Sequence, residues 1–416
     1  MPRAYALLLE NVHATASEVL GEHDVECHLQ PKGLKEDELI AALKEFPADK
    51  PCFVGIRSKT HITPAVLEAI PQLIAVGAFC IGTDQIALDE ARRRGVAVFN
   101  APFSSTRSVA ELVIAEVVML SRQIFGRSKA AHEGRWAKSA SGAHEVRGKT
   151  LGIIGYGHIG SQASILAEAL GMKVVMYDID KRLPLGNAST VGSLEELLQT
   201  ADFVSLHVPD TELTRNMIGA AELAQMKQGS FLLNLSRGKV VDIPALRDAL
   251  VSGHLAGAAV DVYPREPAST TETFESELRG LDNVILTPHI GGSTLEAQAN
   301  IGREVAYALG RYLELGSTLG CVTLPPLDLG SPSQSGRTDC SRIVNVHHNV
   351  PGVLSAVNRV IAESGVNIVG QSLATTDDVG LLFIDLPLAH DHSRAETLKA
   401  AISELPHSVR TRLIWL

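Results

Sequence analysis

Three side chains that can act together in acid–base chemistry each follow a short apolar run in the second half of the chain. They are Arg237 in Leu-Asn-Leu-Ser-Arg-Gly, Glu266 in Asp-Val-Tyr-Pro-Arg-Glu-Pro, and His289 in Thr-Pro-His-Ile-Gly-Gly. A histidine, with an ordinary pKa of about 6.5, exchanges a proton reversibly near neutral pH. A carboxylate can orient the imidazole and stabilise its protonated form, and an arginine is a permanent planar cation that binds carboxylates. These residue types predict reversible proton transfer beside a bound anion.

A glycine-rich loop lies upstream of these residues. Gly155-Tyr-Gly-His-Ile-Gly160 directly follows an apolar run and opens a stretch with a helical pattern. In that setting Gly155 lets the chain turn, Gly157 lets backbone N–H groups approach a pyrophosphate, and Gly160 lets the helix lie close to the sheet. The loop therefore predicts a dinucleotide site.

Asp178 stands at the end of the next predicted strand, where it can accept hydrogen bonds from the adenosine ribose hydroxyls. A carboxylate there repels a 2′-phosphate, so NAD is favoured over NADP. Lys181 and Arg182 follow closely and leave NADP as an alternative, although two solvated surface charges are the simpler interpretation.

Short apolar runs alternate with helical patterns along most of the chain, which is typical of parallel sheets covered by helices. Strands are predicted at 5–9, 51–56, 73–76 and 96–99, and six more at 151–155, 173–177, 203–207, 230–234, 257–262 and 284–287. The six indicate a Rossmann-type doubly wound sheet, and a helix predicted at 294–314 is free to pack back on the N-terminal segment. We expect an α/β fold whose second, flavodoxin-like domain is built from both flanks of the Rossmann domain.

The C-terminal region has a different element order. A Pro-, Gly- and Ser-rich linker precedes a strand, a helix, two strands, a helix and a last strand, predicted at 342–347, 351–364, 366–375, 380–387, 394–405 and 408–415. This βαββαβ order predicts a ferredoxin-like domain. The expected limits are 1–103 with 293–325 for the substrate-binding domain, 104–292 for the NAD-binding domain, 326–340 for the linker and 341–416 for the last domain.

A long helix is predicted at 104–122, with Ser108 and Glu111 at capping-box spacing. Its apolar residues point all round the helix axis, which favours burial between subunits and hence an oligomer. Burial within one subunit is the alternative.

The composition excludes several classes of function. The net charge is −10, the pI is near 5.8, and no basic block is long enough for nucleic acid. No apolar run approaches the roughly 20 residues that span a bilayer, and the N-terminus reads as a strand rather than a signal peptide. The five scattered cysteines fit reduced thiols, so a cytoplasmic protein is expected. The histidine pairs lie in separate loops, and no metal site is expected.

Together with Asn100-Ala-Pro-Phe-Ser and Ser108-Val-Ala-Glu111, these motifs resemble those of the D-2-hydroxyacid dehydrogenase family over about the first 320 residues. The resemblance implies that Arg237, Glu266 and His289 are catalytic. It implies contacts to NAD from the following residues: Gly155, Gly157, His158, Ile159, Gly160, Asp178, His207, Leu235, Ser236, Arg237, Asp261, His289, Gly291 and Gly292.

Within that family, the resemblance extends over nearly the whole chain to the phosphoglycerate dehydrogenases, in their bacterial short form with a C-terminal ACT domain. It implies 3-phosphoglycerate as substrate, with reduction of 2-oxoglutarate as a further activity. Arg57, Ser58 and Lys59 in Gly55-Ile-Arg-Ser-Lys-Thr-His61, together with Lys138 and Arg237, are the implied substrate contacts. Lys59 stands where an arginine is expected, which exchanges a planar fork for a point charge.

The ACT resemblance implies that L-serine binds between paired domains and inhibits the enzyme. His347 and Asn349, in His347-His-Asn-Val-Pro-Gly352, would contact serine from one subunit and Asn367 from the other. Two features depart from the pattern: Val350 replaces a usual arginine, and the linker is longer than expected, with Arg342 as the nearer cation before the domain. An ACT domain that only dimerises is the alternative.

Two interfaces, the apolar helix and the ACT edge, favour a homotetramer. A glyoxylate or hydroxypyruvate reductase of the same family is the second interpretation, and an NAD-sensing corepressor that binds protein partners is a remote third.

Overall fold

The computed structural model describes residues 2–267, 271–331 and 340–416. The chain forms two compact units, Met1–Ser104 with Gln298–Leu416, and Ser105–Ala297. Within the described residues, no helix is both long and apolar enough to cross a membrane.

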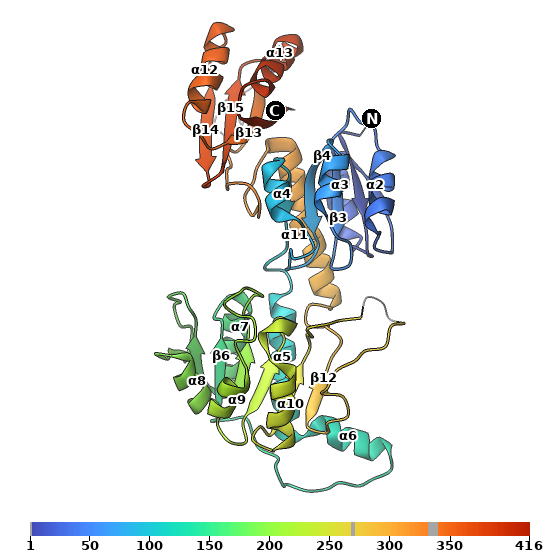
Figure 1. Cartoon of the computed structure of the whole chain (residues 1–416), viewed down its shortest axis with the longest axis vertical. Helices are drawn as coiled ribbons and strands as arrows, with labels where there is room; N and C mark the ends of the chain where they lie inside the picture. The colour runs from blue at the N-terminus through green and yellow to red at the C-terminus, as the bar shows by residue number, and fades with distance from the viewer. Residues whose placement is uncertain (1, 268–270, 332–339) are drawn as a thin grey trace. The chain divides into compact units, whose positions relative to one another are not determined.

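The first unit contains a five-stranded parallel sheet in the order β2-β1-β3-β4-β5, of which β3 and β4 are labelled in Figure 1. Its strands are β1 (Ala4–Leu8), β2 (Val25–Leu29), β3 (Cys52–Ile56), β4 (Leu73–Ala78) and β5 (Ala97–Phe99). Side chains alternate between two apolar cores, as a pleated strand requires: Ala6 and Leu8 join one core, and Leu7 and Leu9 join the other. The first core includes α1 (Thr15–Glu22) and much of α11 (Leu295–Leu315); the second includes α2 (Glu36–Lys44), α3 (Pro64–Ala69) and α4 (Leu88–Arg93).

The same unit contains the C-terminal four-stranded antiparallel sheet, in the order β14-β15-β13-β16. The elements are β13 (Ser341–His348), α12 (Val353–Glu363), β14 (Gly370–Thr375), β15 (Val379–Leu386), α13 (His392–Ser403) and β16 (Ser408–Trp415). The predicted βαββαβ order is confirmed. On β13, Ile343 packs with α12 and α13, whereas Val344 and Val346 pack in the core that contains α11. Residues 332–339 of the predicted linker lie outside the described residues.

The second unit is a seven-stranded parallel sheet in the order β12-β11-β10-β9-β6-β7-β8. Its strands are β6 (Thr150–Ile154), β7 (Lys173–Tyr177), β8 (Ser189–Thr190), β9 (Phe203–Leu206), β10 (Phe231–Asn234), β11 (Gly257–Val260) and β12 (Val284–Leu286). One apolar core joins the sheet to α5 (Thr106–Arg122) and α7 (His158–Ala169); the other joins it to α8 (Leu194–Thr200), α9 (Ala220–Gln225) and α10 (Ile243–Val251). A short helix, α6 (Ile124–His132), follows α5. The order reverses between β6 and β9, which is the position where doubly wound sheets bind ligands.

Helix α5 differs from its prediction at its start. It begins at Thr106, its N-cap residue Ser105 makes no side-chain cap, and Glu111 accepts a hydrogen bond from Arg107 Nε at 2.6 Å. The predicted capping box is therefore wrong. Val109, Val113 and Val117 are buried against the sheet of their own unit, so one face of the helix is covered without a second subunit.

Candidate active site

His289 and Glu266 form a hydrogen-bonded pair, from the loops that follow β12 and β11. His289 Nδ1 lies 2.9 Å from Glu266 Oε2 and 3.1 Å from Oε1. Glu266 also accepts the backbone N–H of Tyr263 at 3.2 Å, which fixes the carboxylate on its own loop. Because Nδ1 faces the carboxylate, Nε2 is the ring nitrogen that can exchange a proton with a substrate.

The pair shifts both pKa values toward the charged forms. The hydrogen bond that His289 donates to Glu266 raises the pKa of His289 above its usual value, although burial and the charge of Arg237 oppose the shift. Burial acts to raise the pKa of Glu266, but the hydrogen bond and charge of His289 outweigh it and leave that pKa below its usual value. The pair therefore stabilises the protonated imidazole that forms when His289 accepts a proton.

Asp261 holds the loop that carries His289. Its carboxylate is buried and accepts hydrogen bonds from Thr287 Oγ1 at 2.6 Å and from the N–H groups of Ile290 at 2.8 Å and Gly291 at 2.9 Å. His289 itself has a φ of 54°, an unusual value for a residue with a side chain. The family resemblance implies a contact from Asp261 to NAD; in the structure its oxygens hold the backbone beside His289.

Arg237 lies on a loop that packs closely against the Glu266 loop. A Cβ added to Gly238 would lie 2.0 Å from the backbone carbon of Tyr263, so only glycine allows this approach. Asn234 closes the loop by donating from Nδ2 to the carbonyl of Arg237 at 3.0 Å. The charge of Arg237 acts on both members of the His289–Glu266 pair. The three predicted catalytic residues therefore lie in one electrostatic neighbourhood.

The predicted dinucleotide loop has the shape that its glycines suggest. Gly155 has a φ of 90°, and a Cβ there would lie 2.4 Å from the carbonyl oxygen of His207. A Cβ on Gly160 would lie 2.4 Å from the carbonyl oxygen of Gly155, whereas Gly157 faces open space with nothing within 4 Å. Gly155 and Gly160 are required by the close packing of the chain itself, whereas Gly157 leaves room for a ligand, so the loop fits a dinucleotide.

Asp178 follows β7 and His207 follows β9, the two strands that pair with β6 on either side of this loop. Asp178 accepts the N–H groups of Tyr156 at 2.8 Å and Asp180 at 2.9 Å, and Arg182 Nε lies 3.6 Å from its carboxylate. Arg182 is thus partly neutralised by Asp178. Burial lowers the pKa of His207 to about 4, so its ring is neutral at physiological pH.

The remaining predicted cofactor contacts lie at the same edge of the second unit. Leu235 and Ser236 follow β10, Gly291 and Gly292 follow β12, and His158 and Ile159 open α7. These positions are at the carboxyl ends of parallel strands, where ligands bind in this class of fold.

The predicted substrate loop lies in the first unit and is organised by a residue that sequence reasoning did not select. Glu10, with a φ of 63° and 8% exposed, accepts the N–H groups of Ser58 at 3.0 Å, Lys59 at 3.0 Å and Thr60 at 2.7 Å. Its signal was its position directly after an apolar strand. The carbonyl of Arg57 accepts a hydrogen bond from Gln85 Nε2, which fixes the other end of the loop.

Lys138, in the second unit, is exposed on the segment after α6. Arg237 is the other predicted substrate contact in this unit, whereas Arg57, Ser58 and Lys59 belong to the first unit. The assignment of Lys138 therefore stays a prediction.

The predicted effector residues occupy the end of β13 and two turns. His347 is buried, with Nδ1 3.1 Å from Asn345 Oδ1, and Asn349 donates to the carbonyl of Thr376 at 2.7 Å. Asn367 is exposed on the segment before β14. Arg342 is completely buried in a two-pronged ion pair with Asp385, at 2.7 and 2.9 Å. Its guanidinium also donates to the carbonyls of Leu315 and Gly330, at 2.8 and 3.0 Å, so its contacts lie inside the unit.

Two regions of the chain match known protein families. Residues 114–291 match the family described as D-isomer specific 2-hydroxyacid dehydrogenase, NAD binding domain. Residues 343–410 match the family described as AHAS small subunit-like ACT domain.

Related proteins cover nearly the whole chain. D-3-phosphoglycerate dehydrogenase of Escherichia coli K12 is 52% identical over 412 residues, which is 98% of this chain and 97% of that protein. Among solved structures, a glyoxylate reductase from Paecilomyes thermophila is 29% identical with a TM-score of 0.69, and covers 77% of this chain and 98% of its own. D-lactate dehydrogenase from Aquifex aeolicus, complexed with NAD and lactic acid, is 28% identical with a TM-score of 0.66, and covers 77% of this chain and 99% of its own.

These matches confirm the predicted α/β architecture with an ACT domain, and the cofactor, NAD. The chain is an NAD-dependent dehydrogenase and belongs to the D-3-phosphoglycerate dehydrogenase family.

Proposed function

We propose that this chain catalyses the reversible, NAD-dependent oxidation of 3-phosphoglycerate to 3-phosphohydroxypyruvate, the first step of the phosphorylated route to L-serine. The observation that carries the proposal is the 52% identity to the E. coli enzyme across both the catalytic and the ACT regions. The hydrogen-bonded His289–Glu266 pair supplies the acid–base chemistry that this reaction needs.

In the oxidation direction, Nε2 of His289 removes the proton of the C2 hydroxyl. Bound NAD supplies the acceptor for the hydride that leaves the same carbon. Glu266 keeps the imidazole oriented and stabilises it once protonated, and Asp261 positions the backbone that follows His289. In the reverse direction the protonated imidazole returns the proton to the carbonyl oxygen.

Arg237 binds the substrate carboxylate and polarises the C2 oxygen, because a planar guanidinium can contact both oxygens of a carboxylate. Arg57, Ser58, Lys59 and Lys138 contact the phosphate end. Glu10 supports this assignment, because it holds the backbone of the Ser58–Lys59 turn in one conformation and leaves the side chains to the ligand.

The domain roles form part of the proposal. Residues 1–103 with 293–325 bind the substrate, 104–292 bind NAD, 326–340 link the catalytic part to the ACT domain, and 341–416 form that regulatory domain. L-Serine binds to paired ACT domains through His347, Asn349 and Asn367, in a homotetramer, and lowers the rate. The exposed position of Asn367 supports a contact with a second ACT domain.

The proposal is tested by following NADH absorbance with the purified chain and four oxo acids: 3-phosphohydroxypyruvate, hydroxypyruvate, glyoxylate and 2-oxoglutarate. We expect the highest kcat/KM with 3-phosphohydroxypyruvate. A higher value with glyoxylate or hydroxypyruvate would assign the chain instead to the reductase branch, which the similarity to the glyoxylate reductase keeps as the second candidate.

Serine regulation is tested in the same assay with and without L-serine, and with Asn367→Ala. We expect serine to inhibit the parent chain and to inhibit the variant only at higher concentration. Turnover that is insensitive to serine in the parent chain would leave the catalytic assignment intact and reject the effector site.

A further inference from the structure

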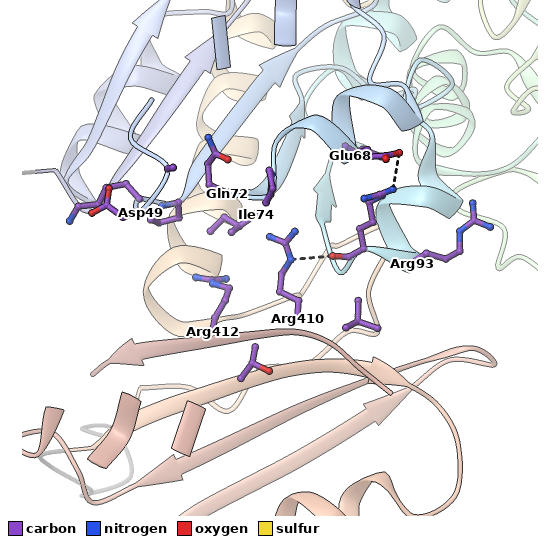
Figure 2. A pocket seen from close by; sticks show the side chains of 15 residues that line it. Asp49, Glu68, Gln72, Ile74, Arg93, Arg410 and Arg412 are labelled. Carbon is purple, nitrogen blue, oxygen red and sulfur yellow. Dashed lines mark hydrogen bonds and ion pairs between the residues drawn. The ribbon is translucent and has the colours of Figure 1, made fainter. Parts of the chain in front are cut away.

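A basic cleft separates β16 of the ACT domain from the parallel-sheet region of the same unit (Figure 2). Its volume is about 590 Å³. One wall is the segment 409–412 of β16, and the other comes from the turn before β3, the end of α3, the turn before β4 and the end of α4. The cleft is not part of the proposed catalytic, cofactor or serine sites.

Five cations line this cleft against two carboxylates. The cations are Lys50, Arg93, Arg94, Arg410 and Arg412, and the carboxylates are Asp49 and Glu68. The whole chain carries a net charge of −10, so this local excess of positive charge runs against the overall composition. A cluster of positive charges in a confined space favours the binding of anions.

Two of these cations have acidic partners. Arg93 Nη2 lies 2.6 Å from Glu90, and Arg94 contacts Glu90 at 2.5 Å and Glu68 at 3.4 Å. Glu68, which is labelled in Figure 2, lines the cleft on the side opposite β16 and pairs with Arg94. Arg93 and Arg94 therefore contribute little unbalanced positive charge to the cleft.

Arg410 and Arg412 have no such partner. Within the described residues, no carboxylate lies within ion-pair distance of either guanidinium. Arg410 donates from Nε to the carbonyl of Arg94 at 3.1 Å and from Nη1 to that of Leu73 at 2.9 Å. Arg412 donates to the carbonyl of Tyr312 and lies over its ring at 4.4 Å. Only neutral groups therefore balance these two charges.

The positive charge of Arg410 is held at an energetic cost. Burial lowers its pKa, and the neighbouring charges of Arg412 and Arg94 lower it further. A guanidinium has five N–H donors, and the two carbonyl contacts use only part of them. Arg410 lines a space large enough for a small anion and keeps donors that its two carbonyl contacts do not use.

We propose that this cleft binds a small anion of the phosphate or phosphate-monoester class, held by Arg410, Arg412 and Lys50. Arginine forks match the oxygen geometry of phosphate, and a doubly charged anion offsets the repulsion between the two guanidinium groups. Because the ligand contacts both β16 and the parallel-sheet region, its binding stabilises their packing. The site does not depend on the proposed catalytic activity.

The alternative is that Arg410 and Arg412 serve only to hydrogen-bond β16 to backbone carbonyls. Isothermal titration calorimetry with inorganic phosphate and the full chain distinguishes the two possibilities, with sodium chloride of equal ionic strength as the control. The matched variants are Lys50→Gln, which removes a charge from the cleft, and Lys59→Gln, which removes one from the proposed substrate loop. Arg412→Lys adds a test of fork geometry with the charge retained.

We expect Lys50→Gln to weaken phosphate binding in the cleft by about tenfold, because one charge-assisted contact is lost, and to leave phosphate binding at the proposed substrate loop unchanged. Lys59→Gln should weaken binding at the substrate loop and leave binding in the cleft unchanged. Glycerol 3-phosphate, titrated in parallel, shows whether a monoester binds more tightly than free phosphate. Phosphate binding that is abolished by Lys59→Gln, or that is the same in the parent chain, Lys50→Gln and Arg412→Lys, would overturn the proposal.

Discussion

Glu116 is a buried carboxyl group in α5 whose ionisation should limit the stability of the second unit at alkaline pH. It is 1% exposed, and within the described residues neither of its carboxylate oxygens has a hydrogen-bond partner. Burial raises its pKa from 4.5 to about 8, and the negative charge of Asp261 adds to the effect. The fold therefore keeps Glu116 protonated at pH values where the unfolded chain has already ionised it.

The sign of the pH dependence follows from this difference. The contribution of Glu116 to stability is complete below its unfolded pKa, falls as the pH rises, and is lost once the pH passes the folded pKa. With pKa values of 4.5 and about 8, the loss between pH 6 and pH 8 is about 2 kcal/mol. Glu116→Gln keeps the size of the side chain and removes the charge, so this loss should disappear.

The assay is urea denaturation of the full chain at pH 6 and pH 8, followed by circular dichroism. The stability of Glu116→Gln relative to the parent chain should rise by about 2 kcal/mol between the two pH values. Glu111→Gln is the matched control, because Glu111 lies on the exposed face of the same helix and pairs only with Arg107. An equal pH dependence in the parent chain and Glu116→Gln would refute the reasoning.

Three further perturbations test other parts of the account. Glu266→Gln should lower the pKa of His289, shift the pH profile of alcohol oxidation to lower pH and reduce kcat, as steady-state assays from pH 6 to 10 would show; an unmoved profile would contradict the pairing. Gly238→Ala should force apart the Arg237 and Glu266 loops and reduce kcat about 100-fold, while circular dichroism shows that the fold is retained. Unchanged activity in this variant would show that the close approach of the two loops is not essential. Arg342→Met removes the buried ion-pair partner of Asp385 and should cost about 3–5 kcal/mol in urea denaturation, whereas Arg342→Met with Asp385→Leu should recover most of it; equal losses would argue against the ion pair as the cause.

The parts of the fold that the sequence predicted best carry strong local signals. Gly155, Gly157 and Gly160 combine with the preceding strand and with Asp178 in one short stretch, and the structure assembles them as expected. Arg237, Glu266 and His289 each follow a strand, so the alignment of parallel strands alone places them at one edge of the sheet.

The features that the sequence did not reveal depend on tertiary contacts. β2 was missed because it is an edge strand with exposed positions, so its Val-Glu-Cys-His-Leu sequence lacks an apolar run. The capping box at Ser108 failed because Ser108 instead bonds to Thr294, 186 residues away. The buried ion pair of Arg342 joins it to Asp385 on the neighbouring strand, a partner that could not be inferred from spacing.

The roles of Glu10 and Asp261 illustrate the same point at the site. Both carboxylates bind backbone N–H groups of a neighbouring loop, and such contacts leave no motif in the sequence. In the sequence, the position of Glu10 and Asp261 directly after a strand was the one feature that indicated a function. Residues that position a site are therefore harder to predict than those that carry its chemistry.

The most direct test of the central claim is the turnover of 3-phosphohydroxypyruvate by the parent chain and by His289→Asn, with NADH binding measured separately by fluorescence. The account predicts rapid NADH oxidation by the parent chain and a loss of about 10²- to 10⁴-fold in kcat for the variant, with NADH affinity retained. Undiminished turnover by His289→Asn, or no turnover of this substrate by a parent chain that binds NADH, would contradict it.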